Sequence, residues 1–409
     1  MEHPKLRTID AFPIQTSGQQ AMCLRDPFNT KNTFVVPNHV FYIICHFDGN
    51  HSILDIQSKF SQKYGKLLSG DNIQQIIQEL DKNLLLENDR SRDFIEKLKG
   101  DFINSTIRKD AHAGTAYEAD KERLTGQIDK FFTSTDGPGK PSSSNKTTDL
   151  KGIIAPHIDV GCGGPCFAWA YKEIAESSDA ELFIILGIAH TETKNLFVLT
   201  DKTFETPFGN VETDKDFLAS LHKKNMTDYF EDEFIHKDEH SVGFQLIFLQ
   251  YLYHRKKVFS IIPILCSSFG EAGRDNNSPG GISQFEEFVS SLKETIKESR
   301  KKICIIASVD LAHVGSRFGD RELQDEAYLK KLHSEDTDML RYVENLDTEG
   351  FNNSIQKDNN SRKICGYPAI HTMLNVIEAS KGKLLKYSQY TDQTNSTVSF
   401  ASMAFYLNI

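Results

Sequence analysis

The chain has 409 residues, enough for two or three domains with a large core. Its formal net charge of -10 argues against nucleic-acid binding through a broad basic face. No apolar run approaches the roughly 18 residues of a membrane span, and the first residues lack the apolar segment of a signal peptide. The seven cysteines are scattered and form no CxxC pair, so we expect a cytoplasmic protein without a disulfide framework.

The first 104 residues predict a small helical module. Ser52 and Asp55 form a capping-box pattern ahead of an amphipathic helix, and a second amphipathic run follows Asp71. Residues 83–88 suggest a short hairpin after the two helices. Helix, helix and hairpin in this order favour a winged-helix fold.

The same region resembles a PqqD-like domain. The resemblance rests on residues 47–56 (FDGNHSILDI), Tyr64-Gly65 and residues 77–86. PqqD-like domains are small winged-helix modules that bind peptides or partner proteins. The resemblance therefore implies a docking role for residues 1–104, and a helical cap with no role of its own is the alternative.

Residues 105–149 differ in composition from both neighbouring regions. Residues 117–132 have a helical pattern, whereas residues 133–148 are rich in Ser, Thr, Gly and Pro. A segment of that composition buries little apolar surface. We therefore expect a helix and a flexible linker between two domains.

From residue 150 to 409, apolar strand candidates alternate with helical patterns. The strand candidates are 151–156, 182–189, 195–200, 258–265, 302–309, 383–388 and 397–407. The helical candidates are 165–177, 214–224, 241–254, 283–299, 319–344 and 366–380. Continuous apolar runs indicate strands buried on both faces. The alternation predicts an α/β sandwich with a largely parallel central sheet.

Four histidines and a cysteine stand beside these apolar runs. His157, His190 and His313 each follow a strand candidate, His240 precedes an apolar helix, and Cys365 precedes a glycine where a helix begins. The carboxyl ends of parallel strands are where α/β proteins place their ligands. Each histidine alone could be a solvated surface residue, but the repetition predicts one metal pocket.

Several roles within this pocket stay open. Imidazole and thiolate ligands suit iron, copper and zinc. Asp310 could enter the pocket with His313, or could orient a ligand histidine. Glu239 and His240 are candidates for a general acid or base. Cys365 could bind metal, act as a nucleophile, or be a small buried apolar residue.

A set of motifs in a fixed order resembles the Memo family. The motifs are Ala155-Pro-His157, Gly163-Gly-Pro-Cys166, Leu186-Gly-Ile-Ala-His190, Thr206-Pro-Phe-Gly209, Glu239-His-Ser241, Ile261–Leu265, Ser308–Gly315, Arg317-Phe318, Ile364-Cys-Gly366 and Ser396–Ser402. The resemblance covers residues 150–409 and implies a fold like that of the class III extradiol dioxygenases. It also implies a metal site of His157, His190 and Cys365 that holds Fe2+ or copper. Asp310 and His313 would line the same pocket.

The whole chain resembles the Memo proteins of the AmmeMemoRadiSam system. That resemblance implies a radical-SAM protein and an Amme-domain protein as partners, and we expect neither nucleic acid nor membrane among them. The chain departs from the family pattern at Gly243, where a carboxylate is usual, at Tyr367-Pro368 and at Ile158–Val160. The predicted metal ligands are retained, but residues expected around a substrate have changed.

Three functions follow from these observations. The first is an iron- or copper-dependent oxidoreductase, dioxygenase-like, with His240, Asp310 and His313 as catalytic residues. The second is a non-catalytic component of a radical-SAM system that binds metal or a partner. The third is a hydrolase with Cys365 as nucleophile. The sequence does not identify the substrate.

Overall fold

The computed structural model describes residues 2–16, 19–142, 150–253, 257–269, 283–320 and 324–407. The chain divides into two compact units, Met1–Asn104 and Ser105–Ile409. Residues 143–149, part of the expected linker, lie outside the described residues. None of the described helices combines the length and apolar character that a membrane crossing requires.

The N-terminal unit combines an antiparallel sheet with helices. The strands are β1 (Asp10–Thr16), β2 (Gln19–Asp26) and β3 (Asn29–Pro37), with β2 in the middle. The helices are α1 (Asn38–Ile44), α2 (Ile53–Tyr64), α3 (Gly70–Lys82) and α4 (Asp89–Asn104). Apolar side chains of β2 and of the first three helices form its core, among them Leu24, Ile44, Ile56 and Ile73.

Two local predictions for this unit have different outcomes. The capping box is confirmed, because the backbone N–H groups of Ser52 and Asp55 each donate to the other residue's side chain. The prediction of a hairpin at residues 83–88 is wrong. Leu86 pairs instead with Leu6 near the start of the chain, and α4 begins directly afterwards. The pairing depends on a contact 80 residues away in sequence, which local patterns do not encode.

The second unit is built on a mixed sheet with a parallel centre. The parallel strands lie in the order β5 (Leu150–Ala155), β11 (Ile303–Ser308), β6 (Leu182–Ile188) and β10 (Ser260–Cys266). Antiparallel strands flank them: β14 (Thr397–Tyr406) beside β5, with β13 (Lys381–Thr391) and β12 (His313–Val314) on β14, and β7 (Phe197–Leu199) beside β10. The predicted α/β class with a parallel central sheet is confirmed, and the antiparallel flanks are an addition.

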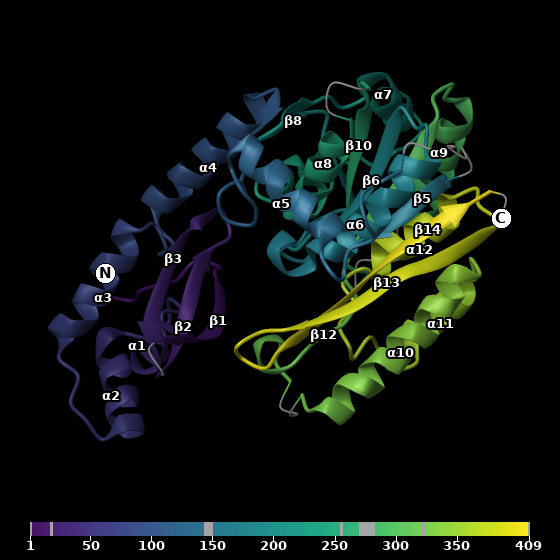
Figure 1. Cartoon of the computed structure of the whole chain (residues 1–409). Helices are drawn as coiled ribbons and strands as arrows, with labels where there is room; N and C mark the ends of the chain where they lie inside the picture. The colour runs from purple at the N-terminus through teal and green to yellow at the C-terminus, as the bar shows by residue number, and fades with distance from the viewer. Residues whose placement is uncertain are drawn as a thin grey trace. The chain divides into compact units, whose positions relative to one another are not determined.

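Helices cover both faces of this sheet (Figure 1). One face carries α5 (Lys121–Thr133), α6 (Val160–Ser177) and α8 (His240–Tyr253). The other carries α7 (Lys215–Lys223), α9 (Gln284–Glu298), α10 (Glu326–Glu344), α11 (Thr348–Gln356) and α12 (Tyr367–Val376). Short elements complete the unit: 3-10 helices η1 (Glu233–Lys237) and η3 (Ser316–Phe318), and a small sheet of β4 (Ile107–Arg108), β8 (Thr203–Thr206) and β9 (Gly209–Val211).

Strand β6 shows why the apolar runs predicted this architecture. Leu182, Ile184 and Leu186 pack into the core on the α12 face, and Phe183 and Ile185 pack into the core on the α8 face. Successive side chains of a strand point to opposite faces. A strand covered by helices on both faces therefore needs apolar residues at every position.

Candidate metal centre

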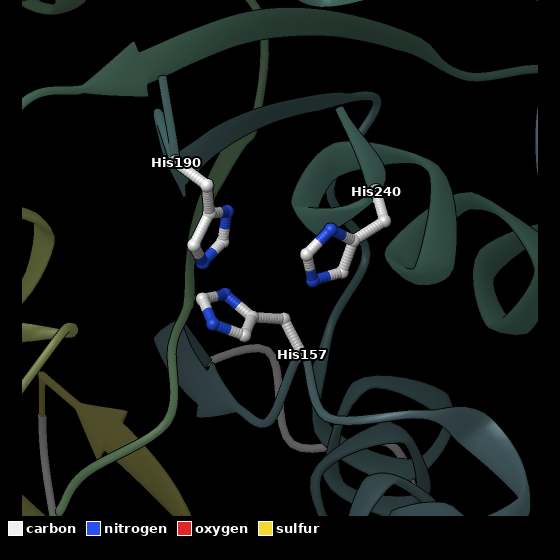
Figure 2. Close-up of side chains that lie close together, drawn as sticks. All are labelled: His157, His190 and His240. Atoms are coloured by element: carbon white, nitrogen blue, oxygen red, sulfur yellow. The ribbon is translucent and has the colours of Figure 1, made fainter. Parts of the chain in front are cut away.

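Three histidines meet at the carboxyl ends of β5 and β6. His157 follows β5, His190 follows β6, and His240 is the first residue of α8. Figure 2 shows the three rings turned toward one another. One ligand nitrogen from each ring lies within 4.8 Å of the other two, and the ring centroids are 4.8 to 5.2 Å apart. This is the only group of three metal-capable side chains among the described residues.

Glu239 holds the rings of His190 and His240. Its Oε2 atom lies 3.0 Å from Nδ1 of His190, and its Oε1 atom lies 3.1 Å from Nδ1 of His240. An ionised carboxylate only accepts hydrogen bonds, so both rings donate from Nδ1–H and carry a lone pair on Nε2 when neutral. Proteins commonly orient histidine ligands with such a carboxylate. We call Glu239, His190 and His240 the imidazole wall.

Glu239 stays ionised although it is buried. Burial by itself raises its pKa, but attraction to the rings of His190 and His240 and the hydrogen bonds from them bring the pKa well below its ordinary value. The backbone N–H groups of His240 and Ser241 also donate to Oε1, at 2.8 and 2.9 Å. The same carboxylate therefore orients two histidines and satisfies the start of α8.

Ser241 fixes the start of α8 against β6. Its hydroxyl accepts from the Ile188 N–H and donates to the Ile188 carbonyl, both at 3.1 Å. The approach requires Gly187, because a Cβ there would lie 2.5 Å from the Ser241 hydroxyl oxygen. This contact sets the spacing between the strand end that carries His190 and the helix that carries His240.

His157 is buried and has a fixed tautomer. Its Nδ1 lies 3.0 Å from the Ser308 carbonyl oxygen, which can only accept, so Nδ1 carries the hydrogen and Nε2 the lone pair. Burial, followed by repulsion from His190 and His240, holds the pKa of His157 well below its ordinary value. A neutral imidazole is the form that binds metal.

Cys365 and Asp310 also lie close to His157. The Cys365 Sγ is 3.4 Å from Nε2 of His157 and 3.5 Å from the Asp310 carbonyl oxygen. Asp310 Oδ1 accepts from the backbone N–H groups of His157 and Ile158, at 3.0 and 3.1 Å, and Oδ2 lies 3.7 Å from Nε2 of His157. Gly366 permits this packing, since a Cβ there would lie 2.6 Å from the Asp310 carbonyl oxygen. We call His157, Cys365 and Asp310 the thiol wall.

Both acidic groups of the thiol wall have raised pKa values. Burial, reinforced by the charge of Asp310, raises the pKa of the Cys365 thiol well above its ordinary value. Burial also raises the pKa of Asp310 to about 7, although the hydrogen bonds from His157 and Ile158 act in the opposite direction. Without a metal, Cys365 is a neutral thiol, and Asp310 can gain or lose a proton near neutral pH.

Another buried carboxylate supports the thiol wall from α10. Asp336 on α10 accepts from the Arg362 guanidinium and from the hydroxyl groups of Tyr387 and Ser399. The carboxylate is fully buried and the guanidinium nearly so. Three donors from separate segments thus converge on one group, which ties α10 to β13, β14 and the segment that precedes α12.

This network holds the two loops of the thiol wall in place. Arg362 precedes Cys365 by three residues, and its carbonyl accepts from the backbone N–H of His313 at 2.8 Å. The Ser399 hydroxyl accepts from the backbone N–H of Ala312 at 3.0 Å, two residues after Asp310. Asp336 therefore acts on the position of both Cys365 and Asp310 without touching either.

His313 borders the pocket without joining the group of three histidines. Its Nδ1 lies 3.1 Å from the Leu311 carbonyl oxygen, and its ring meets Phe318 edge-on with centroids 5.1 Å apart. Burial is the main cause of a pKa lowered to about 4, and repulsion from His190 lowers it further. His313 is therefore neutral at physiological pH.

Two residues at the pocket were missed by the sequence reasoning. Arg108 and His112 lie in the segment expected to connect two domains, yet both contact the turn that carries Glu239. Arg108 stands beside Lys109 and Asp110, and a charged residue among charged neighbours is usually solvated, so no local pattern marked it as buried.

Comparison with known proteins identifies the family. A sequence profile described as Memo-like protein matches residues 108–404. The chain belongs to the Memo family. Its fold is the class III extradiol dioxygenase-like α/β sandwich expected of that family. The match begins at Arg108, so it includes much of the segment between residues 105 and 149.

Relatives of two lengths are found among curated proteins. A MEMO1 family protein of Aquifex aeolicus is 28% identical over 98% of this chain and 100% of its own length. MEMO1 family proteins of Methanopyrus kandleri and Caldivirga maquilingensis are 31% and 29% identical over 73% of this chain, and over 98% and 99% of their own lengths. The Memo unit thus occurs in this family with and without the remaining quarter of the chain.

The donor set fits a transition metal. The hydrogen bonds of His157, His190 and His240 leave the lone pair of each neutral ring on Nε2, and the Cys365 thiol lies beside His157. Imidazole and thiolate ligands suit iron, copper and zinc rather than magnesium or calcium. The structure thereby adds His240 to the ligand candidates, and the assignment of His157, His190 and Cys365 stays a prediction.

Proposed function

We propose that this Memo-family protein binds a redox-active transition metal, Fe2+ or alternatively copper, and acts as a dioxygenase-like oxidoreductase. The observation that carries the proposal is the set of three inward-facing histidines, two of which are oriented by one buried carboxylate. His157, His190 and Cys365 would hold the metal. When bound, the metal would supply a site for dioxygen and for one-electron chemistry.

The protein's own groups provide proton transfer beside that site. Asp310 is suited to gain or release a proton at Oδ2, because burial brings its pKa to about 7. His240 approaches the pocket from α8 and would act either as a further ligand or as the acid or base. His313 is the third candidate for proton transfer, at the edge of the pocket.

Burial of Cys365 favours metal binding over hydrolysis by this residue. A cysteine nucleophile works as the thiolate, which nearby cations or a helix N-terminus usually stabilise. Here burial and the Asp310 carboxylate both raise the pKa of Cys365. A metal ion provides the positive charge that would deprotonate this thiol, whereas the surrounding side chains disfavour the free thiolate.

A non-catalytic role with a radical-SAM protein and an Amme-domain protein is the second candidate. The observation in its favour is the compact N-terminal unit, since relatives in the same family match this chain without a quarter of its length. Because shorter Memo-family proteins lack a quarter of this chain, we expect the N-terminal unit to have a separate role, the docking of a peptide or a partner protein. In this case the metal site would be structural or would serve the partner.

Metal analysis of the anaerobically purified full-length protein tests the metal proposal. We expect near-stoichiometric iron or copper in the wild type and a large loss in His157→Ala and Cys365→Ala. Cys162→Ala and His333→Ala are matched controls that remove one thiol and one imidazole outside the three-histidine group. Full metal content in both pocket variants, or none in the reconstituted wild type, would contradict the proposal.

Oxygen uptake then separates the two candidate functions. Substrate-dependent dioxygen consumption by the Fe2+-loaded protein, lost in His157→Ala, would support the oxidoreductase. A metal-loaded protein that consumes no dioxygen but co-purifies stably with a radical-SAM protein would support the second candidate.

A further inference from the structure

Residues 105–112, which open the second unit and which we call the junction segment, contact the turn before α8. Helix α4 ends at Asn104, the second unit begins at Ser105, and its first strand, β4, begins at Ile107. The backbone N–H of Thr203 donates to the Thr106 carbonyl at 3.0 Å, and the Lys202 ammonium group donates to the Ser105 carbonyl at 2.7 Å. The junction is therefore an integral part of the Memo unit.

Three hydrogen bonds connect this segment to the turn that carries Glu239. Arg108 donates from Nε to the His236 carbonyl at 3.0 Å and from Nη2 to the Glu239 carbonyl at 2.7 Å. His112 Nε2 lies 2.9 Å from the Asp238 carbonyl oxygen, which can only accept, so this ring also donates. Three carbonyl groups within four residues are thus held from one side.

Arg108 is buried, and its environment indicates a role in hydrogen bonding as well as in packing. Its guanidinium lies over the Phe204 ring, 5.4 Å from the centroid, and only 1% of the residue is exposed. Burial lowers the pKa of Arg108, and Tyr117 and Asp110 are the strongest opposing influences. A buried cation carries a large desolvation penalty, so apolar residues of similar volume would pack at least as well. The two carbonyl groups explain why an arginine is placed here.

The position of His112 is also fixed by several contacts. Its ring packs edge-on against His240 and Phe244, with centroids 5.9 and 5.6 Å apart. Asp110 orders the loop by accepting from the backbone N–H of His112, at 2.9 Å, and from the Tyr117 hydroxyl, at 2.9 Å. His112 therefore supports the same turn and also the ring of His240.

We propose that Arg108 and His112 are positioning residues that hold the 236–239 turn, and through Glu239 set the orientation of both His190 and His240. The inference deepens the proposed function, because it assigns the alignment of two metal-binding rings to the junction segment. Neither residue needs to touch the metal. A shift of the Glu239 backbone would move the one carboxylate to which both rings donate.

The test measures metal affinity and ring tautomers in the full-length protein. Arg108→Met removes the donors and keeps a long side chain, and Lys109→Met is the matched control, since Lys109 is exposed and pairs with Glu205. We expect Arg108→Met to weaken Co2+ or Fe2+ binding by about 10-fold or more, as removal of groups behind metal ligands commonly does. Lys109→Met should change it by less than about 2-fold.

A double-mutant cycle distinguishes positioning from a separate effect. If Arg108 acts through Glu239, Arg108→Met should weaken binding little further in a Glu239→Gln background, because the two changes interrupt one chain of contacts. Additive losses would overturn the proposal. His112→Phe keeps the aromatic packing but removes a single donor, so it should give a smaller loss, and it serves as the test variant if Arg108→Met does not fold.

Nitrogen-15 NMR of the histidine rings in metal-free protein gives a readout that needs no metal. The wild type should show Nδ1–H tautomers for His190 and His240, and Arg108→Met should show mixed tautomers with unchanged signals for His157. Unchanged rings in Arg108→Met and His112→Phe would overturn the proposal. A wild type with ordered tautomers that fails to bind metal would contradict the proposed function and leave the positioning role supported.

Discussion

Glu239 and Asp310 are both buried carboxylates at one pocket, yet their pKa values shift in opposite directions. Glu239 faces two imidazole rings that donate to it, and its pKa falls well below the ordinary value. Asp310 accepts only two backbone N–H bonds from His157 and Ile158, and burial raises its pKa to about 7. The number and charge of the donors therefore decide whether a buried carboxylate is ionised.

The two walls also differ in how directly a buried carboxylate supports them. The imidazole wall contains its own orienting group, because Glu239 touches both rings directly. The thiol wall depends on Asp336, which acts through Arg362 and Ser399 on the loops of Cys365 and Asp310. We expect changes in the imidazole wall to affect metal binding first, and changes at Asp336 to affect stability first.

The largest expected effect is the loss of folding stability on substitution of Asp336. Asp336→Asn removes the fully buried counter-charge of the Arg362 guanidinium and leaves only the part-exposed Asp358, 3.8 Å from Nε. Because breaking a buried pair costs about 3–5 kcal/mol, we expect a loss of unfolding free energy toward the lower end of that range. Asp338→Asn is the control on the same helix, since Asp338 pairs with Arg341 on the surface and should change stability by less than about 0.5 kcal/mol. Urea denaturation monitored by circular dichroism measures both. Equal stability of the two variants would show that the thiol wall does not depend on Asp336.

Glu239→Gln should have the next largest effect, on metal affinity. A glutamine has one acceptor oxygen, so only one of the two rings can keep its acceptor, and affinity should fall by about 10- to 100-fold. Competition with a chromophoric chelator measures the affinity. Glu231→Gln removes an exposed carboxylate that pairs with Lys194 and should leave affinity unchanged. A Glu239→Gln protein that binds metal as tightly as wild type would contradict the role of the imidazole wall.

The opposite pKa shifts predict opposite pH dependences of stability in the metal-free protein. For Asp310, the folded-state pKa of about 7 lies above the ordinary value of an aspartate, so its contribution to stability is full below about pH 4 and is lost as the pH rises to about 7. For Glu239, the depressed pKa gives a contribution that is full above about pH 4.5 and is lost as the pH falls.

Asp310→Asn isolates the thiol-wall half of this difference, because asparagine keeps an acceptor for the two backbone N–H groups. The variant should lose less unfolding free energy than the wild type between about pH 5 and about pH 8. Urea denaturation at both pH values provides the comparison. Parallel curves for the two proteins would mean that Asp310 ionises normally.

The smallest effect on metal binding is expected at His313. Its ring donates to the Leu311 carbonyl and lies outside the group of three histidines, so His313→Gln should change metal affinity by less than about 3-fold. Metal titration of this variant beside His240→Gln makes the test. A loss at His313 that equals or exceeds the loss at His240 would place His313 among the ligands.

Much of the fold was predictable from local patterns. The apolar run at 182–189 predicted a strand buried on both faces, and the alternation of strands and helices predicted the α/β class with a parallel central sheet. The capping box at Ser52 and Asp55 is confirmed for the same reason. These features depend on side-chain periodicity and on bonds within a few residues, which a sequence states directly.

The histidines could be selected from the sequence, but their arrangement could not. His157 and His190 follow strand ends, and parallel strands bring their carboxyl ends to one edge of the sheet. The sequence alone therefore determined the fold class, the family resemblance and the edge of the sheet at which ligands gather. It did not show that Glu239 holds two rings, because that depends on the direction in which α8 begins.

Only the tertiary structure decided how the pocket is supported. Arg108 reaches the Glu239 carbonyl across 131 positions in sequence, and Cys365 reaches His157 across 208. A charged residue in a polar segment and a cysteine before a glycine have the same local appearance whether they are solvated or buried. Their surroundings are set by which elements pack together, so burial, pKa and hydrogen-bond partners appear only once the chain has folded.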